Sequence, residues 1–297
     1  MRTSFYDANE CKDNCGFGLI AHMHGNASHD LLQKAIESLT CMTHRGGIAA
    51  DGKTGDGCGL LLQMPDHFMR QTAYDVFAVE LTESFGVGMV FLSQNHDRAA
   101  YARNTLNRAL QDHGMEVVGW RKVPVDDTCL GPMAKEVMPR IEQVFVNSHN
   151  MRGEVLEARL LVARKITMYA LTRDTDCYIC SLSHRVLSYK GLMMPVDLPV
   201  FYRDLGDPSL ATAICTFHQR FSTNTFPAWP LAHPYRMIAH NGEINTVKGN
   251  FNWLRAREGT MRSAVLGEDL RKLNPIVYEG QSDTATFDNC LELLVMS

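Results

Sequence analysis

The sequence predicts a protein of mixed α and β structure in which β-sheets are covered by helices. Stretches with the period of strands alternate with stretches with the period of helices along the 297 residues, with no low-complexity linker or internal repeat. Most of the predicted strands are apolar on both faces, as strands are when another layer covers each side of a sheet. These patterns leave open whether the strands form one sheet or two.

The predicted strands are short apolar runs bounded by glycine or by polar residues. They cover residues 16–22, 85–92, 117–123, 141–146, 177–182, 186–189, 213–218 and 237–240. Because the runs at 177–182 and 186–189 are joined by a short link, we expect them to pair as a hairpin.

The predicted helices have apolar residues at helical spacing. They cover residues 32–42, 98–113, 155–171, 247–257 and 284–297, and residues 51–59 form a glycine-rich loop. In the last helix the predicted apolar stripe is Phe287, Cys290, Leu291 and Leu294. This helix stops with no glycine, proline or basic cap, which indicates that the chain is the N-terminal piece of a longer protein.

Composition excludes several classes of protein. The net charge is −4 with no basic block, which argues against a nucleic-acid face. No apolar run reaches the roughly 18 residues that a membrane span needs, and the first residues have no apolar signal core. The nine cysteines are an odd number scattered through regular segments, so we expect reduced thiols and a cytoplasmic protein.

A cysteine flanked by glycines opens the first predicted strand, in the segment Cys15-Gly16-Phe17-Gly18. Glycines at these positions let the backbone approach a ligand or another segment closely. The alternative is a buried structural thiol, which is common for free cysteine. Cys11 is a competing nucleophile, but it lacks both the glycines and the strand that would position it.

Two donors for a developing oxyanion occur in the turn that contains Asn241 and Gly242. The side-chain amide of Asn241 and the backbone N–H of Gly242 suit that task. The alternative is an ordinary tight turn, because Asn-Gly pairs mark turns in many proteins.

Two charged residues could hold the two ends of an amino acid. Arg220 follows a predicted strand, where its planar guanidinium could bind a carboxylate with two parallel hydrogen bonds; the alternative is a surface ion pair. Asp283 starts the last predicted helix, where it could face an ammonium group; the alternative is that Ser282 and Asp283 only cap the helix.

Two further motifs are set aside. Residues 47–54 match the pattern of a P-loop, but a helical segment precedes them and a glycine-rich stretch follows, whereas a P-loop needs a strand before it and a helix after it. Cys177, Cys180 and His184 have no fourth ligand at matching spacing for structural zinc, so we expect core thiols and no metal site.

Taken together, these segments resemble the class II glutamine amidotransferases. Cys15-Gly16-Phe17-Gly18, His44-Arg45-Gly46, residues 218–223, residues 240–245 and Ser282-Asp283 occur in the order of that family. Three further stretches, residues 51–59, 221–225 and 229–232, are similar to the large subunits of glutamate synthases. The resemblance runs from about Cys15 to the end of the chain.

The resemblance implies an α+β fold of the N-terminal nucleophile hydrolase type, an αββα sandwich of two antiparallel sheets between helix layers. It implies that residues 1–14 are a propeptide and that residues 15–297 form the glutaminase domain, incomplete at its C-terminus. Removal of the propeptide would give Cys15 a free α-amino group with a pKa of roughly 7.7–8.0, which can act as the base for its own thiol.

The resemblance also assigns the other site residues. Cys15 would attack the side-chain amide of glutamine, and Asn241 and Gly242 would form the oxyanion hole. Arg220 would hold the α-carboxylate, Asp283 the ammonium group, and Arg45 would lie beside the nucleophile.

In the full-length enzyme, ammonia released from L-glutamine would aminate 2-oxoglutarate in downstream synthase domains. Those domains would carry FMN and an iron–sulfur cluster and would work with a pyridine-nucleotide-dependent small subunit, while this segment itself would hold no cofactor. The alternatives are another class II amidotransferase, or a catalytically idle fragment that keeps the fold.

Overall fold

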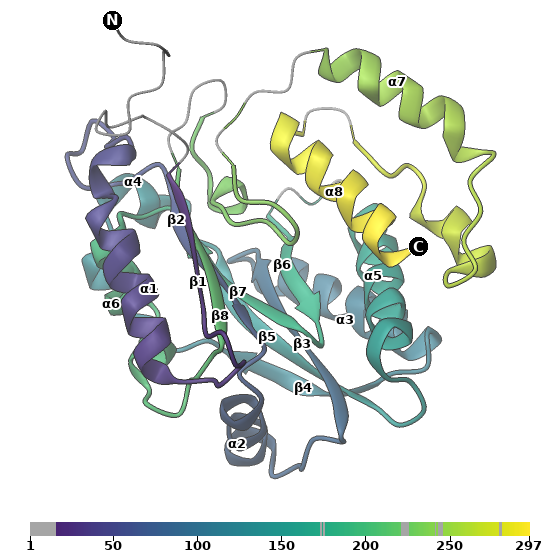
Figure 1. Cartoon of the computed structure of the whole chain (residues 1–297), viewed down its shortest axis with the longest axis horizontal. Helices are drawn as coiled ribbons and strands as arrows, with labels where there is room; N and C mark the ends of the chain where they lie inside the picture. Colours follow the sequence, from purple (N-terminus) through teal and green to yellow (C-terminus); the bar gives the residue numbers. More distant parts are fainter. Residues whose placement is uncertain are drawn as a thin grey trace, which may run out of the picture.

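The computed structural model describes residues 16–172, 174, 176–220, 226–240, 242, 246–278 and 281–297. Within these residues two antiparallel sheets lie face to face (Figure 1). The first has the strand order β1 (Phe17–Ala21), β8 (Ile214–Gln219), β2 (Cys58–Gln63) and β7 (Val186–Gly191). The second has the order β4 (Glu116–Lys122), β5 (Arg140–Ser148), β3 (Ser84–Leu92) and β6 (Tyr178–Ser183).

Helices cover the outer faces of both sheets (Figure 1). Helix α1 (His29–Cys41) packs on β1 and β8, and helices α3 (His96–Asp112) and α5 (Gly153–Ala170) pack on the second sheet. The remaining helices in the described part of the chain are α2 (Asp66–Phe77), α4 (Pro132–Glu136), α6 (Leu198–Phe201), α7 (Val247–Glu258) and α8 (Asp283–Met296). The layers are therefore helix, sheet, sheet, helix, which confirms the αββα sandwich of two antiparallel sheets.

Strands of the second sheet are apolar on both faces because each face packs against a different core. Val87 and Met89 of β3 belong to the core that joins the two sheets, together with Leu60 of β2. Val90 and Leu92 of the same strand belong instead to the core under α3 and α5. Because side chains alternate along a strand, a sheet covered on each side favours apolar residues on both faces of its strands.

Gly59 of β2 allows strand β7 and the segment at His233 to approach closely. A Cβ atom at this position would lie 2.7 Å from the carbonyl oxygen of His233 and 2.8 Å from that of Tyr189. We therefore expect Gly59→Ala to lower the free energy of unfolding by about 1–3 kcal/mol through overpacking. Gly206→Ala, where no heavy atom lies within 4 Å, is the matched control and should be near neutral. Equal denaturation midpoints for the two variants would contradict this account.

Two sequence-based strand predictions are wrong. β6 and β7 do not form a hairpin, because β6 pairs with β3 in one sheet and β7 pairs with β2 in the other. The link between them turns at Ser183, whose Oγ accepts hydrogen bonds from the N–H groups of Arg185 and Val186. Residues 237–240 form no strand, because the N–H groups of Met237 and Ile238 donate to the carboxylate of Asp288.

The predicted apolar stripe of α8 is also wrong. Phe287 is 49% exposed and Leu294 is 72% exposed. The buried face of α8 carries Asp288, Asn289 and Glu292 instead, beside Leu293. This helix is held against the protein by buried ions as well as by apolar contacts.

The buried ions join α8 to α5. Glu292 pairs with Arg164 of α5, and with Arg236 at 3.1 Å between Oε1 and Nε. Burial raises the pKa of the Glu292 carboxyl, but Arg164 and Arg236 outweigh it and hold that pKa below its usual value. Lys165, next along α5, donates from Nζ to the carbonyl oxygen of Ile276 at 3.0 Å.

Lys165 predicts a pH dependence of stability. Burial, reinforced by the charge of Arg164, lowers the pKa of Lys165 to about 7. Between that value and the unfolded pKa of roughly 10.4 the unfolded chain binds this proton and the folded chain does not, so stability rises with pH. We expect the free energy of unfolding of the wild type to rise relative to Lys165→Met between pH 7 and pH 9, by up to about 1.4 kcal/mol per pH unit. A constant difference between the two proteins over that range would contradict the prediction.

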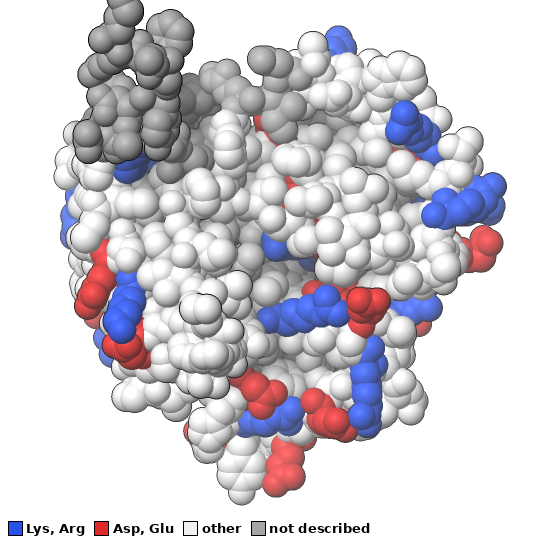
Figure 2. All heavy atoms as spheres, viewed as in Figure 1, with Lys and Arg blue, Asp and Glu red and all other residues white. Residues whose placement is uncertain are grey.

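Charges on the surface are mixed, and on the face shown in Figure 2 basic and acidic side chains lie next to one another. Among the residues that the structure describes, no helix is long and apolar enough to cross a membrane.

Candidate functional site

Three segments meet where β1 begins and β8 ends. The N–H of Gln219, the last residue of β8, donates to the carbonyl oxygen of Gly16 at 2.6 Å. A Cβ atom at Gly16 would lie 2.6 Å from the carbonyl oxygen of Gln219 and 3.3 Å from the Cβ of Arg45. The close approach therefore requires glycine after Cys15 and places Arg45, the last residue of the 3-10 helix η1 (Thr43–Arg45), beside the start of β1. Cys15 itself lies outside the described residues.

Arg220 follows β8 at the same end of the sheet. Its N–H donates to the carbonyl oxygen of Gly57 at 2.9 Å, and the residue is only 7% exposed. Burial lowers the pKa of the Arg220 guanidinium, while the nearby Tyr235 and Asp56 favour its charged form. Arg220 is therefore a buried cation fixed through its backbone, unlike the surface ion pair considered as the alternative.

Asp56 is a residue near the site to which the sequence assigned no role. It is 9% exposed, and a Cβ atom at Gly47 would lie 2.5 Å from its Oδ2. Its N–H donates to the carbonyl oxygen of Gly47 at 3.1 Å. The signal that could have identified it is an acid between two glycines inside the loop of residues 51–59.

That glycine-rich loop is anchored on α4. The Asp51 carboxylate accepts hydrogen bonds from the N–H groups of Lys53, Thr54 and Met133, and from the Thr54 hydroxyl. The bond from that hydroxyl is the main reason that the pKa of Asp51 lies below its usual value, and the bonds from the backbone add to it. The loop is followed by strand β2, so its surroundings are not those of a P-loop, in which a helix follows.

Cys177 and Cys180, which have the spacing of zinc ligands, are buried. Cys177 lies just before β6 and Cys180 within it. Burial raises the pKa of each thiol to about 12, so both are protonated at neutral pH. The described part of the chain contains no cluster of three or more His, Cys, Asp or Glu side chains suited to a metal ion.

The predicted oxyanion turn has one described member, since Asn241 lies outside the described residues. The N–H of Gly242 donates to Nδ1 of His240 at 2.6 Å. The donor predicted for the oxyanion is therefore engaged with the imidazole of His240, whose Nδ1 must be unprotonated to accept this bond.

Asp283 is the first residue of α8, and Ser282 is its N-cap, because Ser282 Oγ accepts from the N–H of Ala285 at 3.3 Å. Asp283 is therefore not the capping residue. It lines a cavity of about 680 Å³ between α7 and α8, together with His240 and Thr284. Neither Arg45 nor Arg220 is part of the described lining of this cavity.

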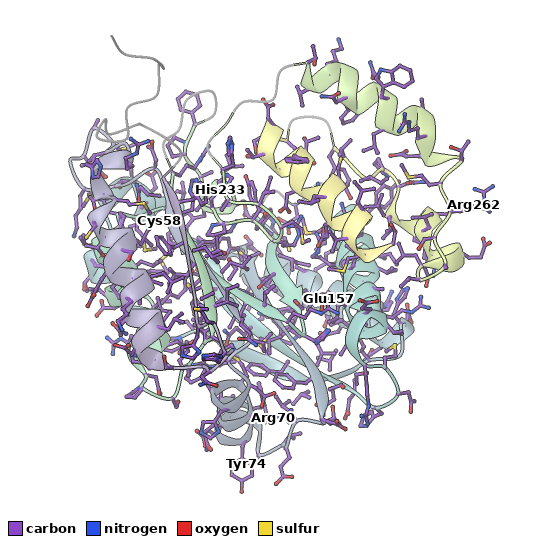
Figure 3. The ribbon with its side chains drawn as sticks, in the orientation of Figure 1. Cys58, Arg70, Tyr74, Glu157, His233 and Arg262 are labelled. Atoms are coloured by element: carbon purple, nitrogen blue, oxygen red, sulfur yellow. The ribbon has the colours of Figure 1, made fainter. Side chains whose placement is uncertain are left out.

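A stack of rings connects strand β8 to the start of α8. The ring centroid of His233 lies 4.7 Å from that of His218 in β8 and 4.2 Å from that of Tyr235. The Tyr235 hydroxyl lies 3.3 Å from Ser282 Oγ, and His233 Nε2 lies 3.4 Å from Thr284 Oγ1. His233 is thus held between β8 and α8 (Figure 3).

His233 is uncharged at neutral pH, and a buried lysine holds the segment just before it. Burial, and then the charge of the neighbouring His218, lower the pKa of His233 well below its usual value. Lys190 is fully buried, and its Nζ donates to the carbonyl oxygens of Pro230 at 2.9 Å and Ala232 at 2.7 Å. No pattern in the sequence identifies His233, Tyr235 or Lys190, because their role depends on contacts between distant segments.

Comparison with known proteins identifies the family of this chain. The family model described as glutamine amidotransferases class-II matches residues 15–297. The large chain of the NADPH glutamate synthase of Bacillus subtilis is 42% identical over 288 residues, which are 96% of this chain and 19% of that protein. The ferredoxin-dependent glutamate synthase 2 of Synechocystis is 40% identical over 96% of this chain and 18% of its own length.

A third relative, the NADH glutamate synthase of Schizosaccharomyces pombe, is 38% identical over 99% of this chain and 14% of its own length. The chain thus spans about a fifth or less of the curated relatives that it matches. The family match over residues 15–297, together with the two facing antiparallel sheets, shows that this chain belongs to the class II glutamine amidotransferases.

Proposed function

We propose that this chain hydrolyses L-glutamine to glutamate and ammonia, with Cys15 as an N-terminal nucleophile freed by removal of residues 1–14. The observation that carries the proposal is the hydrogen bond between Gln219 and Gly16. It fixes the residue covalently next to Cys15 against the residue next to Arg220, so the neighbours of the proposed nucleophile and carboxylate ligand adjoin each other. Membership of the class II amidotransferases supports the same chemistry.

The reaction follows from the groups assigned to the site. The Cys15 thiol passes its proton to its own α-amino group, and the sulfur attacks the side-chain amide carbon of glutamine. The negative charge on the carbonyl oxygen is stabilised by the Asn241 side chain and the Gly242 N–H. The α-ammonium group returns the proton to the leaving nitrogen, which departs as ammonia, and water then cleaves the γ-glutamyl thioester to give glutamate.

The substrate is held at its two charged ends. Arg220 binds the α-carboxylate with a planar fork of donors, and its burial strengthens the pairing because water competes less there. Asp283 binds the ammonium group, and Arg45 orders the backbone around Cys15. Before Gly242 can serve the oxyanion, the imidazole of His240 must turn away from its N–H.

In its full-length context we propose that the chain is the glutaminase domain of a glutamate synthase, because the relatives described above bear that name. The ammonia would aminate 2-oxoglutarate in downstream domains that carry FMN and an iron–sulfur cluster, with electrons from a pyridine-nucleotide-dependent small subunit. These groups belong to parts of the protein that this chain does not cover. We also propose a cytoplasmic location.

The test is glutamine turnover by the purified chain and by the longer polypeptide that carries it. We expect glutamate and ammonia in equal amounts from L-glutamine, and far slower release from L-asparagine, whose shorter side chain cannot reach the nucleophile while both charged ends are held. Turnover by neither protein would support the idle fragment instead. Turnover that feeds an acceptor other than 2-oxoglutarate would support another class II amidotransferase.

A further inference from the structure

Asp288 joins α8 to the segment that leads into the oxyanion turn. It lies in the second turn of α8 and is fully buried. Its Oδ1 accepts hydrogen bonds from the N–H groups of Met237 at 2.7 Å and Ile238 at 3.2 Å. Met237 and Ile238 come just before His240 and Gly242 in the sequence.

The carboxylate of Asp288 is itself held in place. Its Oδ2 lies 2.7 Å from Nη2 of Arg236, and the same nitrogen donates to Oδ1 of Asn289 at 2.8 Å. The Nε of Arg236 donates to Glu292, which in turn pairs with Arg164 on α5. Burial opposes the charge of Arg236, but Glu292 and Asp288 outweigh it and raise the pKa of its guanidinium. The ion pair therefore anchors the Asp288 side chain against Arg236.

The same helix carries Asp283 about 1.4 turns earlier, in the lining of the cavity that His240 also lines. The start of the helix also contacts the residues before Arg236. Ser282 lies against Tyr235, and Thr284 lies against His233. A single rigid helix thus contacts the segment on both sides of Arg236 and presents the proposed ammonium ligand.

If Asp288 served only to form an ion pair, its contact with the Arg236 guanidinium would be enough. The bonds from two successive backbone N–H groups go further, because they take the place of strand pairing and fix the path of the chain toward residue 240. We propose that Asp288 is a positioning residue for glutamine hydrolysis: through the N–H groups of Met237 and Ile238 it sets the oxyanion turn relative to Asp283. It touches no substrate, and the proposal rests on the glutaminase function proposed above.

Two substitutions separate positioning from charge. Asp288→Asn keeps an oxygen that can accept both backbone bonds. It loses the charge and turns its amide nitrogen toward Arg236, which keeps its pairing with Glu292. Asp288→Glu keeps the charge but moves the carboxylate by one methylene. In the chain or the longer polypeptide, active sites are counted by alkylation of Cys15 with an electrophilic glutamine analogue, and kcat is expressed per labelled site. This normalisation removes any loss of folded protein from the comparison.

Positioning predicts that Asp288→Asn keeps kcat within about 3-fold, while Asp288→Glu lowers it about 10-fold or more, with KM for glutamine changed less than kcat. Leu293→Ala, on the buried face of the same helix, is the control: it should lower the unfolding midpoint and leave kcat per site unchanged. Equal values for the two Asp288 variants, a larger loss in Asp288→Asn, or an equal loss in Leu293→Ala would overturn the proposal. A wild type that neither labels nor hydrolyses glutamine would refute the glutaminase function itself.

Discussion

Replacing Cys15 with alanine is expected to abolish glutamine hydrolysis, with a loss of at least about 10³-fold in kcat. The thiol is the atom that forms the thioester, and no neighbouring group in the proposed mechanism can replace it. The measurement is steady-state release of glutamate and ammonia. In a full-length polypeptide, synthesis from added ammonia should continue, because that reaction bypasses the nucleophile.

Cys11→Ala is the matched control, because Cys11 lies in the segment proposed to be removed. It should hydrolyse glutamine like the wild type. If Cys15→Ala retained turnover while Cys11→Ala lost it, the nucleophile would be Cys11 and the proposed processing site would be wrong.

Replacing Arg220 with lysine is expected to lower kcat/KM for glutamine by about 100-fold. Lysine keeps the charge but not the fork of donors, so one of two charge-assisted hydrogen bonds to the α-carboxylate is lost and the other is displaced. Each such bond contributes roughly 1.5–3 kcal/mol, which corresponds to at least about tenfold. The measurement is kcat/KM with L-glutamine.

Arg262→Lys is the control for this substitution, because Arg262 is exposed and points away from the protein (Figure 3). Its kcat/KM should match the wild type. An Arg220→Lys variant with unchanged kcat/KM would show that Arg220 does not bind the carboxylate, whatever its burial.

The layered fold could be predicted where one segment alone contains the information. Residues 85–92 of β3 and residues 144–146 of β5 are apolar or glycine at successive positions, and the structure covers both of their faces. Pairing could not be predicted in the same way, because the short strands β6 and β7 contain nothing that favours a neighbour over the opposite sheet. The strand expected at residues 237–240 failed for a related reason, since its N–H groups bond to an acid about fifty residues later.

Helix α8 shows most clearly that the buried face of a helix cannot always be predicted from its own sequence. Its sequence contains an apolar stripe, and a helix seen alone should bury it. The protein buries Asp288 and Glu292 instead, because Arg164 and Arg236 lie on the surface that α8 covers. No pattern within residues 283–296 reveals those distant cations.

Some features of the candidate site could be predicted from the sequence, and others could not. The glycine beside Cys15, the place of Arg220 directly after a strand and the place of Asp283 at the start of a helix agree with the sequence prediction. The bond between Gly242 and His240 and the ring stack at His233 arise only from three-dimensional contacts. Cys15 and Asn241 lie outside the described residues, so their assigned roles stay predictions.

The most direct test of the central proposal is intact mass and N-terminal sequencing of the same preparation whose glutamine turnover is measured. The account predicts that active protein begins at Cys15, and that an electrophilic glutamine analogue adds once, at this residue, as turnover is lost. Full turnover by protein that still begins at Met1 would contradict it, because Cys15 would then have no free α-amino group to accept the proton of its thiol.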